Sequence, residues 1–228
     1  MQIELIPDGA PRIDERAPPF TGRSTQGPIE LGDFAGRWLV FFAHPADFTP
    51  VCASEFVAFA RHAERFAALD CALLGLSVDS VYAHLAWRES IRERFGVSID
   101  FPVLEDVSMD IAHRYDMIEP RGSRSAVRAL FVIDPNGIVR AKLHYPVNVG
   151  RSVSEVLRLL EALQTADRLK VVTPEGWKPG EDTIEPPPET AADTDARRTA
   201  SGTLAYGCVD WYYYKRPSAG ESAGAEKS

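Results

Sequence analysis

The architecture of this chain follows from residues 38–77, which open with the apolar run Trp38-Leu39-Val40-Phe41-Phe42-Ala43. A continuous apolar run of this length is typical of a strand that is buried on both faces of a sheet. Between Cys52 and Leu69 the apolar residues recur at spacings of three and four, which predicts an amphipathic helix with an aromatic stripe. The run Cys71-Ala72-Leu73-Leu74-Gly75-Leu76-Ser77 predicts a second buried strand. Together these segments predict a βαβ unit, and hence an α/β domain.

Local signals predict the remaining elements of a domain that spans residues 1–168. Polar caps and glycines mark helix ends, and an Asn-Gly pair between two β-rich runs is a strong hairpin signal. In chain order, the predicted elements are a helix from Ser80 to Gly96, a strand at Phe101–Leu104, a hairpin over Leu130–Leu143 with its turn at Asp134–Gly137, and a helix opened by the capping box of Ser152 and Glu155. Parallel strands followed by a hairpin, with helices on both faces, predict a mixed sheet of the thioredoxin type.

Composition limits the classes of function. The 228 residues carry 25 Lys plus Arg against 33 Asp plus Glu, a formal net charge of −8, which disfavours nucleic acid and anionic membranes as partners. With 45% hydrophobic and 25% charged residues, the composition is that of a globular domain. No apolar run reaches the ~18 residues of a membrane helix, and the stretch Met1–Asp8 lacks the features of a signal peptide. We therefore expect a cytoplasmic protein.

Residues 169–216 differ in character and are predicted to form an extended C-terminal arm that is exchanged within a dimer. Prolines with acidic and small residues between them predict an extended chain. The arm nevertheless carries an aromatic cluster, namely Tyr206, Trp211, Tyr212, Tyr213 and Tyr214. Because large aromatic side chains usually bury much of their surface, these residues pack either on their own domain or on another subunit. Residues 217–228, rich in Ala, Gly, Ser and Glu, are predicted to be a disordered tail.

The three cysteines, Cys52, Cys71 and Cys208, are too few and too widely spaced for a zinc site or a disulfide scaffold. Cys52 is the informative one, because it follows a strand and a proline-containing loop and opens a helix. Unpaired backbone N–H groups and the helix dipole favour a thiolate at such a position. Position alone would still favour a small buried residue, as most free cysteines are. Cys71 lies inside a predicted strand and is expected in the core.

The loop before this cysteine strengthens the case for a reactive thiol. It reads His44-Pro45-Ala46-Asp47-Phe48-Thr49-Pro50-Val51-Cys52. Its prolines restrict the backbone, and Thr49 can place its hydroxyl at the sulfur of Cys52. The thiol is therefore expected in a rigid polar pocket.

This loop is also where the chain resembles a known family. Pro45, Thr49 and Cys52 reproduce the Pro-x-x-x-Thr-x-x-Cys motif of peroxiredoxins, and with Glu55 the string looks like the one-Cys subfamily and its archaeal thioredoxin-peroxidase relatives. The resemblance runs from about Pro18 to Tyr214. It implies a thioredoxin-like fold, as the order of elements does independently.

The resemblance also implies roles for individual residues. Cys52 would be the nucleophile, Thr49 would orient the peroxide, and Pro45 would shield the thiolate. The family uses an arginine from a later strand to hold the thiolate and the peroxide, and Arg128 at the head of the first hairpin strand matches it. Arg151 matches a position that supports the first arginine; by itself it is only a charge before a helix.

The implied activity is the reduction of hydrogen peroxide and organic hydroperoxides through a cysteine sulfenic acid, with electrons from a cellular thiol reductant. A homodimer or a higher ring assembly is expected, as in relatives. The alternative is a redox-sensing or chaperone-like interaction protein on the same fold, in which oxidation of Cys52 is a signal and turnover is incidental. A thiolate attacks a peroxide without metal or flavin, and the five histidines show no metal-ligand spacing, so neither a cofactor nor a metal is expected.

Cys208 is where the chain departs from its relatives. Those with such an arm carry a later cysteine after a Cys-x-Asp-Trp segment, and that cysteine commonly closes a disulfide with the peroxidatic one of another subunit. Here the segment reads Cys208-Val209-Asp210-Trp211-Tyr212-Tyr213-Tyr214, without the later thiol. Either Cys208 has taken over resolution of Cys52, or an external thiol attacks the sulfenic acid. We expect the former, because a thiol in a mobile segment near a sulfenic acid is hard to keep unreactive.

Overall fold

The computed structural model describes residues 10–118, 125–201 and 208–218 of the chain. The chain divides into two compact units, residues 1–153 and 154–228, which are described one at a time. Among the described residues, none of the helices has both the length and the apolar character needed to cross a lipid bilayer.

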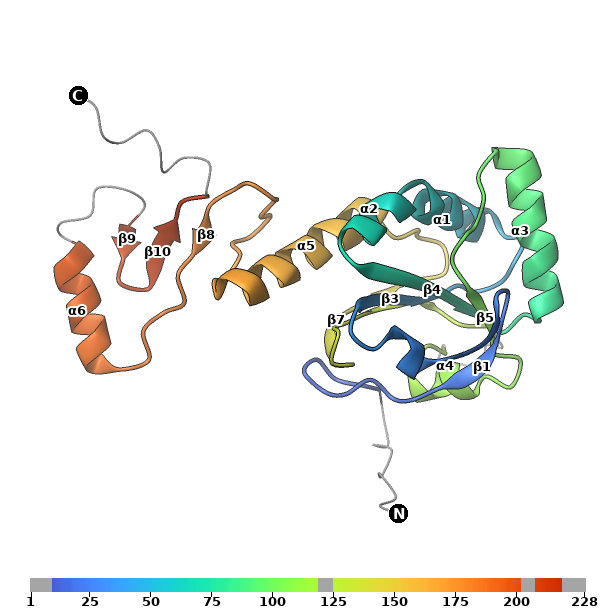
Figure 1. Cartoon of the computed structure of the whole chain (residues 1–228), viewed down its shortest axis with the longest axis horizontal. Coiled ribbons are helices and arrows are strands. Elements are labelled where there is room, and N and C mark those ends of the chain that lie inside the picture. The colour runs from blue at the N-terminus through green and yellow to red at the C-terminus, as the bar shows by residue number, and fades with distance from the viewer. Residues whose placement is uncertain (1–9, 119–124, 202–207, 219–228) are drawn as a thin grey trace, which may run out of the picture. The chain divides into compact units, whose positions relative to one another are not determined.

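The first unit is built on a seven-stranded sheet with the order β2-β1-β5-β4-β3-β6-β7 (Figure 1). Its strands are β1 (Thr21–Ser24), β2 (Gly27–Glu30), β3 (Trp38–Ala43), β4 (Cys71–Ser77), β5 (Val103–Glu105), β6 (Arg128–Ile133) and β7 (Val139–Tyr145). Strands β3, β4 and β5 run parallel, and the other pairings are antiparallel. The predicted mixed sheet is confirmed, and β3 and β4 have the bounds that their apolar runs indicate.

The helices of this unit begin and end at recognisable signals. They are η1 (Leu31–Phe34, a 3₁₀ helix), α1 (Pro50–Arg61), α2 (Ala63–Ala68), α3 (Val81–Phe95) and α4 (Asp110–Arg114). The hydroxyl of Ser80 accepts a hydrogen bond from the Ala83 N–H at the start of α3, and Gly96 ends that helix in the left-handed conformation with φ 64°. The single helix predicted between Cys52 and Leu69 is in fact two helices, because the chain bends at His62.

Strand β3 lies at the centre of the core, and its alternate residues face opposite sides of the sheet. Phe42 stacks on Phe59 of α1 with ring centroids 4.3 Å apart. Phe41 points the other way and meets Phe20 and Tyr115, each at 5.1 Å between centroids. Helix α1 therefore covers one face of the sheet, and the residues following α4 cover the other. All six residues of β3 are buried. The loop that follows its C-terminal end therefore begins in the core of this unit.

The β6–β7 hairpin determines which residues lie near the C-terminal end of β3. The carboxylate of Asp134 accepts from the Asn136 and Ile138 N–H groups in the turn, which confirms the predicted hairpin. Strand β6 runs antiparallel to β3 with Leu130 opposite Phe42, so the residue that opens β6, Arg128, lies beyond that end of β3. Arg128 pairs in turn with Tyr145, which brings the residues after β7 to the same place.

The second unit contains α5 (Val153–Leu169), which begins at the boundary, and α6 (Ala191–Ser201). A three-stranded sheet of order β8-β10-β9 is formed by β8 (Thr183–Ile184), β9 (Cys208–Asp210) and β10 (Tyr213–Arg216). Residues 169–216 thus carry a helix and a small sheet. In the aromatic cluster, Tyr206 lies outside the described residues and Tyr212 is 53% exposed. Most of the predicted tail, residues 219–228, also lies outside the described residues.

Candidate active site

Cys52 occupies the first turn of α1. Thr49 is at the N-cap position, and Pro50 is the first helical residue. Backbone N–H groups in a first helical turn have no intrahelical acceptor, and the helix dipole is positive there. The Cys52 side chain is 0% exposed. The thiol therefore lies in a buried position that favours negative charge.

The loop between β3 and α1 has a constrained backbone. Phe48 has a φ of 57°, in the left-handed region that aromatic residues seldom adopt, and its side chain is 61% exposed. The Thr49 hydroxyl donates to the Ala46 carbonyl at 2.9 Å, so its oxygen lone pairs remain available as acceptors. Pro45, four residues before Thr49 in the same loop, is half-buried. The expected role of Thr49 toward groups at the sulfur of Cys52 stays a prediction.

Arg128 connects three parts of the site through one guanidinium. Its Nη1–H lies 3.4 Å from the sulfur of Cys52, within reach of a hydrogen bond to sulfur. The same nitrogen donates to Oε2 of Glu55 at 2.8 Å. Its Nε and Nη2 both donate to the carbonyl of Val147, at 3.0 and 2.8 Å. With its exposed fraction only 2%, Arg128 is fixed in place and is not a rim charge.

Glu55 is the functional residue that the sequence analysis did not assign. Its Oε1 accepts from the Arg151 backbone N–H at 2.7 Å and from Arg151 Nε at 2.9 Å, and its Oε2 accepts from Arg151 Nη2 at 2.8 Å. Arg151 also donates to the Ala129 carbonyl. Burial alone would raise the pKa of Glu55, but the hydrogen bonds and charge of Arg151, with the charge of Arg128, hold that pKa below its ordinary value. The signal available in the sequence was a carboxylate one turn after Cys52, on an otherwise apolar helix face.

The charges of this buried group do not cancel while the thiol is neutral. Arg128 and Arg151 supply two positive charges and Glu55 supplies one negative charge, and all three side chains are at most 2% exposed. An unmatched charge in a low-dielectric interior is costly, and a nearby opposite charge relieves the cost. The thiolate form of Cys52 supplies that opposite charge. The described side chains of this group therefore carry one excess buried positive charge next to the sulfur of Cys52.

A second buried cluster is formed by two residues of the loop between β3 and α1 and one residue of α3. Asp47 accepts from His44 Nε2 at 2.8 Å and from His84 Nδ1 at 2.7 Å. The His44 ring lies 4.7 Å from that of Phe56, which is one turn after Cys52 on α1. Because an ionised carboxylate only accepts, both histidine nitrogens that face it carry hydrogens. Burial, opposed in part by Asp47, lowers the pKa of His44. Asp47 thus ties the active-site loop to α3 through His84.

The same three side chains are the candidates for a metal site. Their ligand atoms lie within 4.8 Å of one another, and two histidines with an aspartate suit several transition metals. A metal-bound histidine normally donates its other ring N–H to a partner. Within the described part of the chain, His44 Nδ1 and His84 Nε2 have no hydrogen-bond partner. The arrangement therefore fits a hydrogen-bonded cluster better than a metal centre. Sequence spacing did not reveal it, because His84 is far from Asp47 along the chain.

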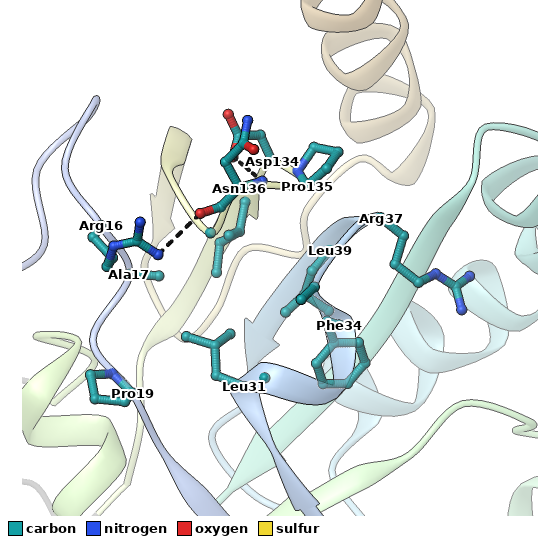
Figure 2. Close-up of a pocket in the computed structure, with 14 residues that line it drawn as sticks. Arg16, Ala17, Pro19, Leu31, Phe34, Arg37, Leu39, Asp134, Pro135 and Asn136 are labelled. Carbon is teal, nitrogen blue, oxygen red and sulfur yellow. Dashed lines mark hydrogen bonds between the residues drawn. The ribbon is translucent and has the colours of Figure 1, made fainter.

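A pocket at the other end of β3 offers different chemistry. It has a volume of about 230 Å³ and is lined in part by Leu31, Phe34 and Leu39. Figure 2 shows Arg16 and Arg37 on either side of these apolar residues, with Arg16 donating to the Asn136 carbonyl. None of its lining residues is a serine, threonine, cysteine or histidine, so the pocket offers no hydroxyl, thiol or imidazole side chain. The thiol chemistry therefore belongs to the opposite end of the strand.

Comparison with known proteins agrees with this geometry. Residues 13–142 match the AhpC/TSA family, and residues 162–199 match the C-terminal domain of 1-Cys peroxiredoxin. A peroxiredoxin of Aquifex aeolicus is 48% identical over 218 residues, which cover 90% of this chain and 96% of that protein. The chain belongs to the peroxiredoxin family. It is accordingly a thiol-dependent peroxidase, an oxidoreductase with a thioredoxin fold.

Solved peroxiredoxin structures match both the fold and most of the length of this peroxiredoxin. A yeast mitochondrial 1-Cys peroxiredoxin has a TM-score of 0.78 and 38% identity, over 90% of this chain and 99% of that one. In that yeast protein the thiol resolving mechanism operates via the glutathione and thioredoxin systems. Peroxiredoxin 6 of Arenicola marina has a TM-score of 0.79 and 28% identity, over 91% and 98% of the two chains.

The other two cysteines of this peroxiredoxin differ from Cys52. Cys71 is buried in β4, as expected, and burial raises the pKa of its thiol to about 12, so it stays protonated at neutral pH. Cys208 opens β9, where its backbone pairs with Tyr214, and its side chain lies outside the description. Of the two cysteine side chains that the structure describes, Cys52 is the one that hydrogen-bonds to a charged partner.

Proposed function

We propose that Cys52 is the peroxidatic nucleophile and that Arg128 holds both its thiolate and the incoming peroxide. The observation that carries this assignment is the single Arg128 Nη1, which reaches both the sulfur of Cys52 at 3.4 Å and the carboxylate of Glu55 at 2.8 Å. Guanidinium groups suit this task because they stay charged and donate in a fixed fork. In this proposal the nucleophile is on helix α1 and the group that stabilises its charge is on strand β6 of the same unit.

The proposed reaction needs only the thiolate, the peroxide and the thiols that reduce the sulfenic acid. The thiolate sulfur attacks one peroxide oxygen, so that an S–O bond forms and the O–O bond breaks. The sulfur is oxidised and the peroxide is reduced by two electrons, and the departing hydroxide or alkoxide takes a proton and leaves as water or an alcohol. A thiol then attacks the sulfenic acid, which releases water and forms a disulfide, and a further thiol returns Cys52 to its reduced state.

The remaining site residues have supporting roles in this proposal. The Thr49 hydroxyl, directed by its bond to the Ala46 carbonyl, offers its lone pairs to the peroxide hydrogen. Pro45 narrows the approach to the thiolate. Arg151 acts through Glu55, because its four donors to that carboxylate and to the Ala129 carbonyl fix the partner of Arg128. Arg151 is therefore a positioning residue.

The thiol that resolves the sulfenic acid has two candidates. Cys208 belongs to a segment of short strands in the second unit, and we propose it as the resolving thiol. A glutathione or thioredoxin system, as described for the yeast relative, is the other candidate and the proposed final electron donor. Subunits are proposed to associate as a homodimer in which the residues after 168 are exchanged.

Stopped-flow kinetics with Cys52→Ser tests the assignment of the nucleophile. The variant should consume no peroxide beyond the uncatalysed rate, since a serine hydroxyl is not ionised near neutral pH. Cys71→Ala is the matched control, because it removes a thiol that burial keeps protonated, and it should retain the wild-type rate. Turnover that survives in Cys52→Ser would reject the proposal. Consumption of many equivalents of peroxide by the wild type, with a thiol reductant present, separates a peroxidase from a redox sensor that is oxidised once.

A further inference from the structure

The loop that Arg128 contacts is uncharged, although the centre of the site is charged. Residues 146–150, which follow β7 and are called here the 146–150 loop, read Pro-Val-Asn-Val-Gly and carry no charge. All five are exposed, with Val147 at 44% and Val149 at 46%. The neighbouring sulfur of Cys52 is 0% exposed. Exposed apolar side chains that are grouped next to a functional site can form part of a ligand-binding surface.

Two sets of contacts hold this loop beside the sulfur. The carbonyl of Val147 accepts two hydrogen bonds from Arg128, the residue that also donates to Cys52. At Gly150 the backbone comes so close to α1 that an added Cβ would lie 3.3 Å from Cγ1 of Val51. A bond from the Val149 N–H to the Pro146 carbonyl closes the turn between these anchors. The two valines are therefore attached to the catalytic guanidinium at one end and to the helix of the nucleophile at the other.

We propose that Val147 and Val149 are specificity-determining residues that contact the organic group of a hydroperoxide while its O–O bond lies at Cys52. This inference rests on the proposed function of Cys52 and Arg128. Hydrogen peroxide has no organic group and gains nothing from an apolar rim, whereas an alkyl or aryl hydroperoxide gains the burial of its apolar surface. The bond changes are the same for both substrates, with an alcohol leaving in place of water. The rim thus raises the rate for organic hydroperoxides relative to hydrogen peroxide.

A substrate accounts for the exposed valines of the 146–150 loop better than a second copy of the chain does. The carbonyl of Val147 is bonded to the guanidinium that is proposed to receive the peroxide, and the loop that carries both valines lies against α1 at Gly150. These hydrogen bonds link the position of the 146–150 loop to the position of Arg128. A loop that served only as a subunit contact would need to be exposed but would not need bonds to Arg128.

The test compares second-order rate constants for cumene hydroperoxide and hydrogen peroxide in Val147→Thr, Val149→Thr and the double variant. Threonine keeps the shape of valine and replaces a methyl by a hydroxyl, and both sites are half-exposed, so the chain should fold. One methylene in a hydrophobic pocket is worth ~10-fold or more. At these half-exposed positions we expect the ratio of the cumene rate to the hydrogen peroxide rate to fall ~3-fold in each single variant and ~10-fold in the double variant.

Val107→Thr is the matched control, because Val107 is an exposed valine of the same unit that follows β5, and the ratio should stay at the wild-type value. An unchanged ratio in the double variant would overturn the proposal. So would an equal fall in both rates, which would mean that the substitutions disturb only Arg128. An unchanged ratio with a weakened dimer in light scattering would instead assign the valines to a subunit contact. A wrong assignment of Cys52 as the nucleophile would be detected separately, as turnover of peroxide by Cys52→Ser.

Discussion

Arg128 and Glu55 form a buried ion pair of 2.8 Å, and the nitrogen that makes it also points to the sulfur of Cys52. The carboxylate thereby determines where the guanidinium lies relative to the thiol. Arg151 holds the other edge of the same carboxylate, so no member of the group can move alone. Rate and stability should therefore change together when this group is altered.

Arg128→Ala should slow the reaction of Cys52 with peroxide by ~100-fold, because a charge-stabilising donor in a buried site commonly contributes that much. The measurement is the rate of sulfenic acid formation by stopped-flow fluorescence. Arg92→Ala removes an arginine whose partner is the exposed Glu89, and it should react at the wild-type rate. An unchanged rate in Arg128→Ala would reduce Arg128 to a structural charge.

Glu55→Gln should both destabilise the fold and slow the reaction. The substitution leaves two buried guanidinium groups without a carboxylate, and breaking a buried ion pair from one side costs about 3 kcal/mol. Misplacement of Arg128 should lower the peroxide rate ~10-fold or more. Urea denaturation and stopped-flow kinetics measure the two effects. Glu64→Gln on the exposed surface of α2 should alter neither; a stable, fully active Glu55→Gln would contradict the positioning role.

The free energy of unfolding should fall as the pH drops below about 6.5, the ordinary pKa of histidine. Burial lowers the pKa of His44, nearby His84 lowers it further, and Asp47 opposes this only in part. The unfolded chain therefore binds a proton that the folded chain excludes, so stability present above pH 6.5 is lost as the pH falls toward the folded pKa.

His44→Asn, whose amide can still donate to Asp47, should flatten this dependence by up to ~1.4 kcal/mol per pH unit between pH 6.5 and 5. Urea titrations at several pH values give the slope. A wild-type slope in His44→Asn would show that His44 does not titrate as described.

Treatment with one equivalent of peroxide should convert the wild type to a covalent dimer on a nonreducing gel. The bridge should be absent in both Cys52→Ser and Cys208→Ser and present in Cys71→Ala, because only the first two thiols are proposed to react. A monomer band, with Cys52 trapped by a sulfenic-acid reagent in the wild type, would instead make this a one-Cys enzyme. In that case the reductant attacks Cys52 directly.

Truncation before Pro186 should weaken or abolish dimer formation, since it removes the proposed exchanged segment with Trp211 and its neighbouring tyrosines. Static light scattering at micromolar concentration measures the assembly. Removal of residues 219–228 alone is the control and should leave the dimer intact. A full-length monomer under these conditions would refute the exchange.

Several elements of the fold were predictable because their signals are local. The apolar runs of β3 and β4, the Ser80 cap and the Gly96 end of α3 each depend on a few adjacent residues. The hairpin β1–β2 was not predicted, because Thr21–Glu30 is largely polar and lacks alternation. Its strands are at one edge of the sheet, where partial exposure removes the hydrophobic signal.

The site was predictable only where a motif or a resemblance named its residues. Cys52, Arg128 and Arg151 were identified in this way, and the structure brings all three together around Glu55. His84 was overlooked, because its partner Asp47 is distant along the chain and only the packing of α3 joins them. Contacts between helices and loops leave no periodic trace in a sequence.

The charge count at Cys52 has a consequence for the whole catalytic cycle. The thiolate balances the buried arginines, but a neutral sulfenic acid at the same sulfur leaves one positive charge unmatched again. In the proposed cycle the charge of this buried group therefore alternates, being balanced in the thiolate state and carrying one excess positive charge in the sulfenic acid state. We therefore expect oxidation to make the buried charges less favourable at the stage of the cycle when a second thiol must reach the sulfur.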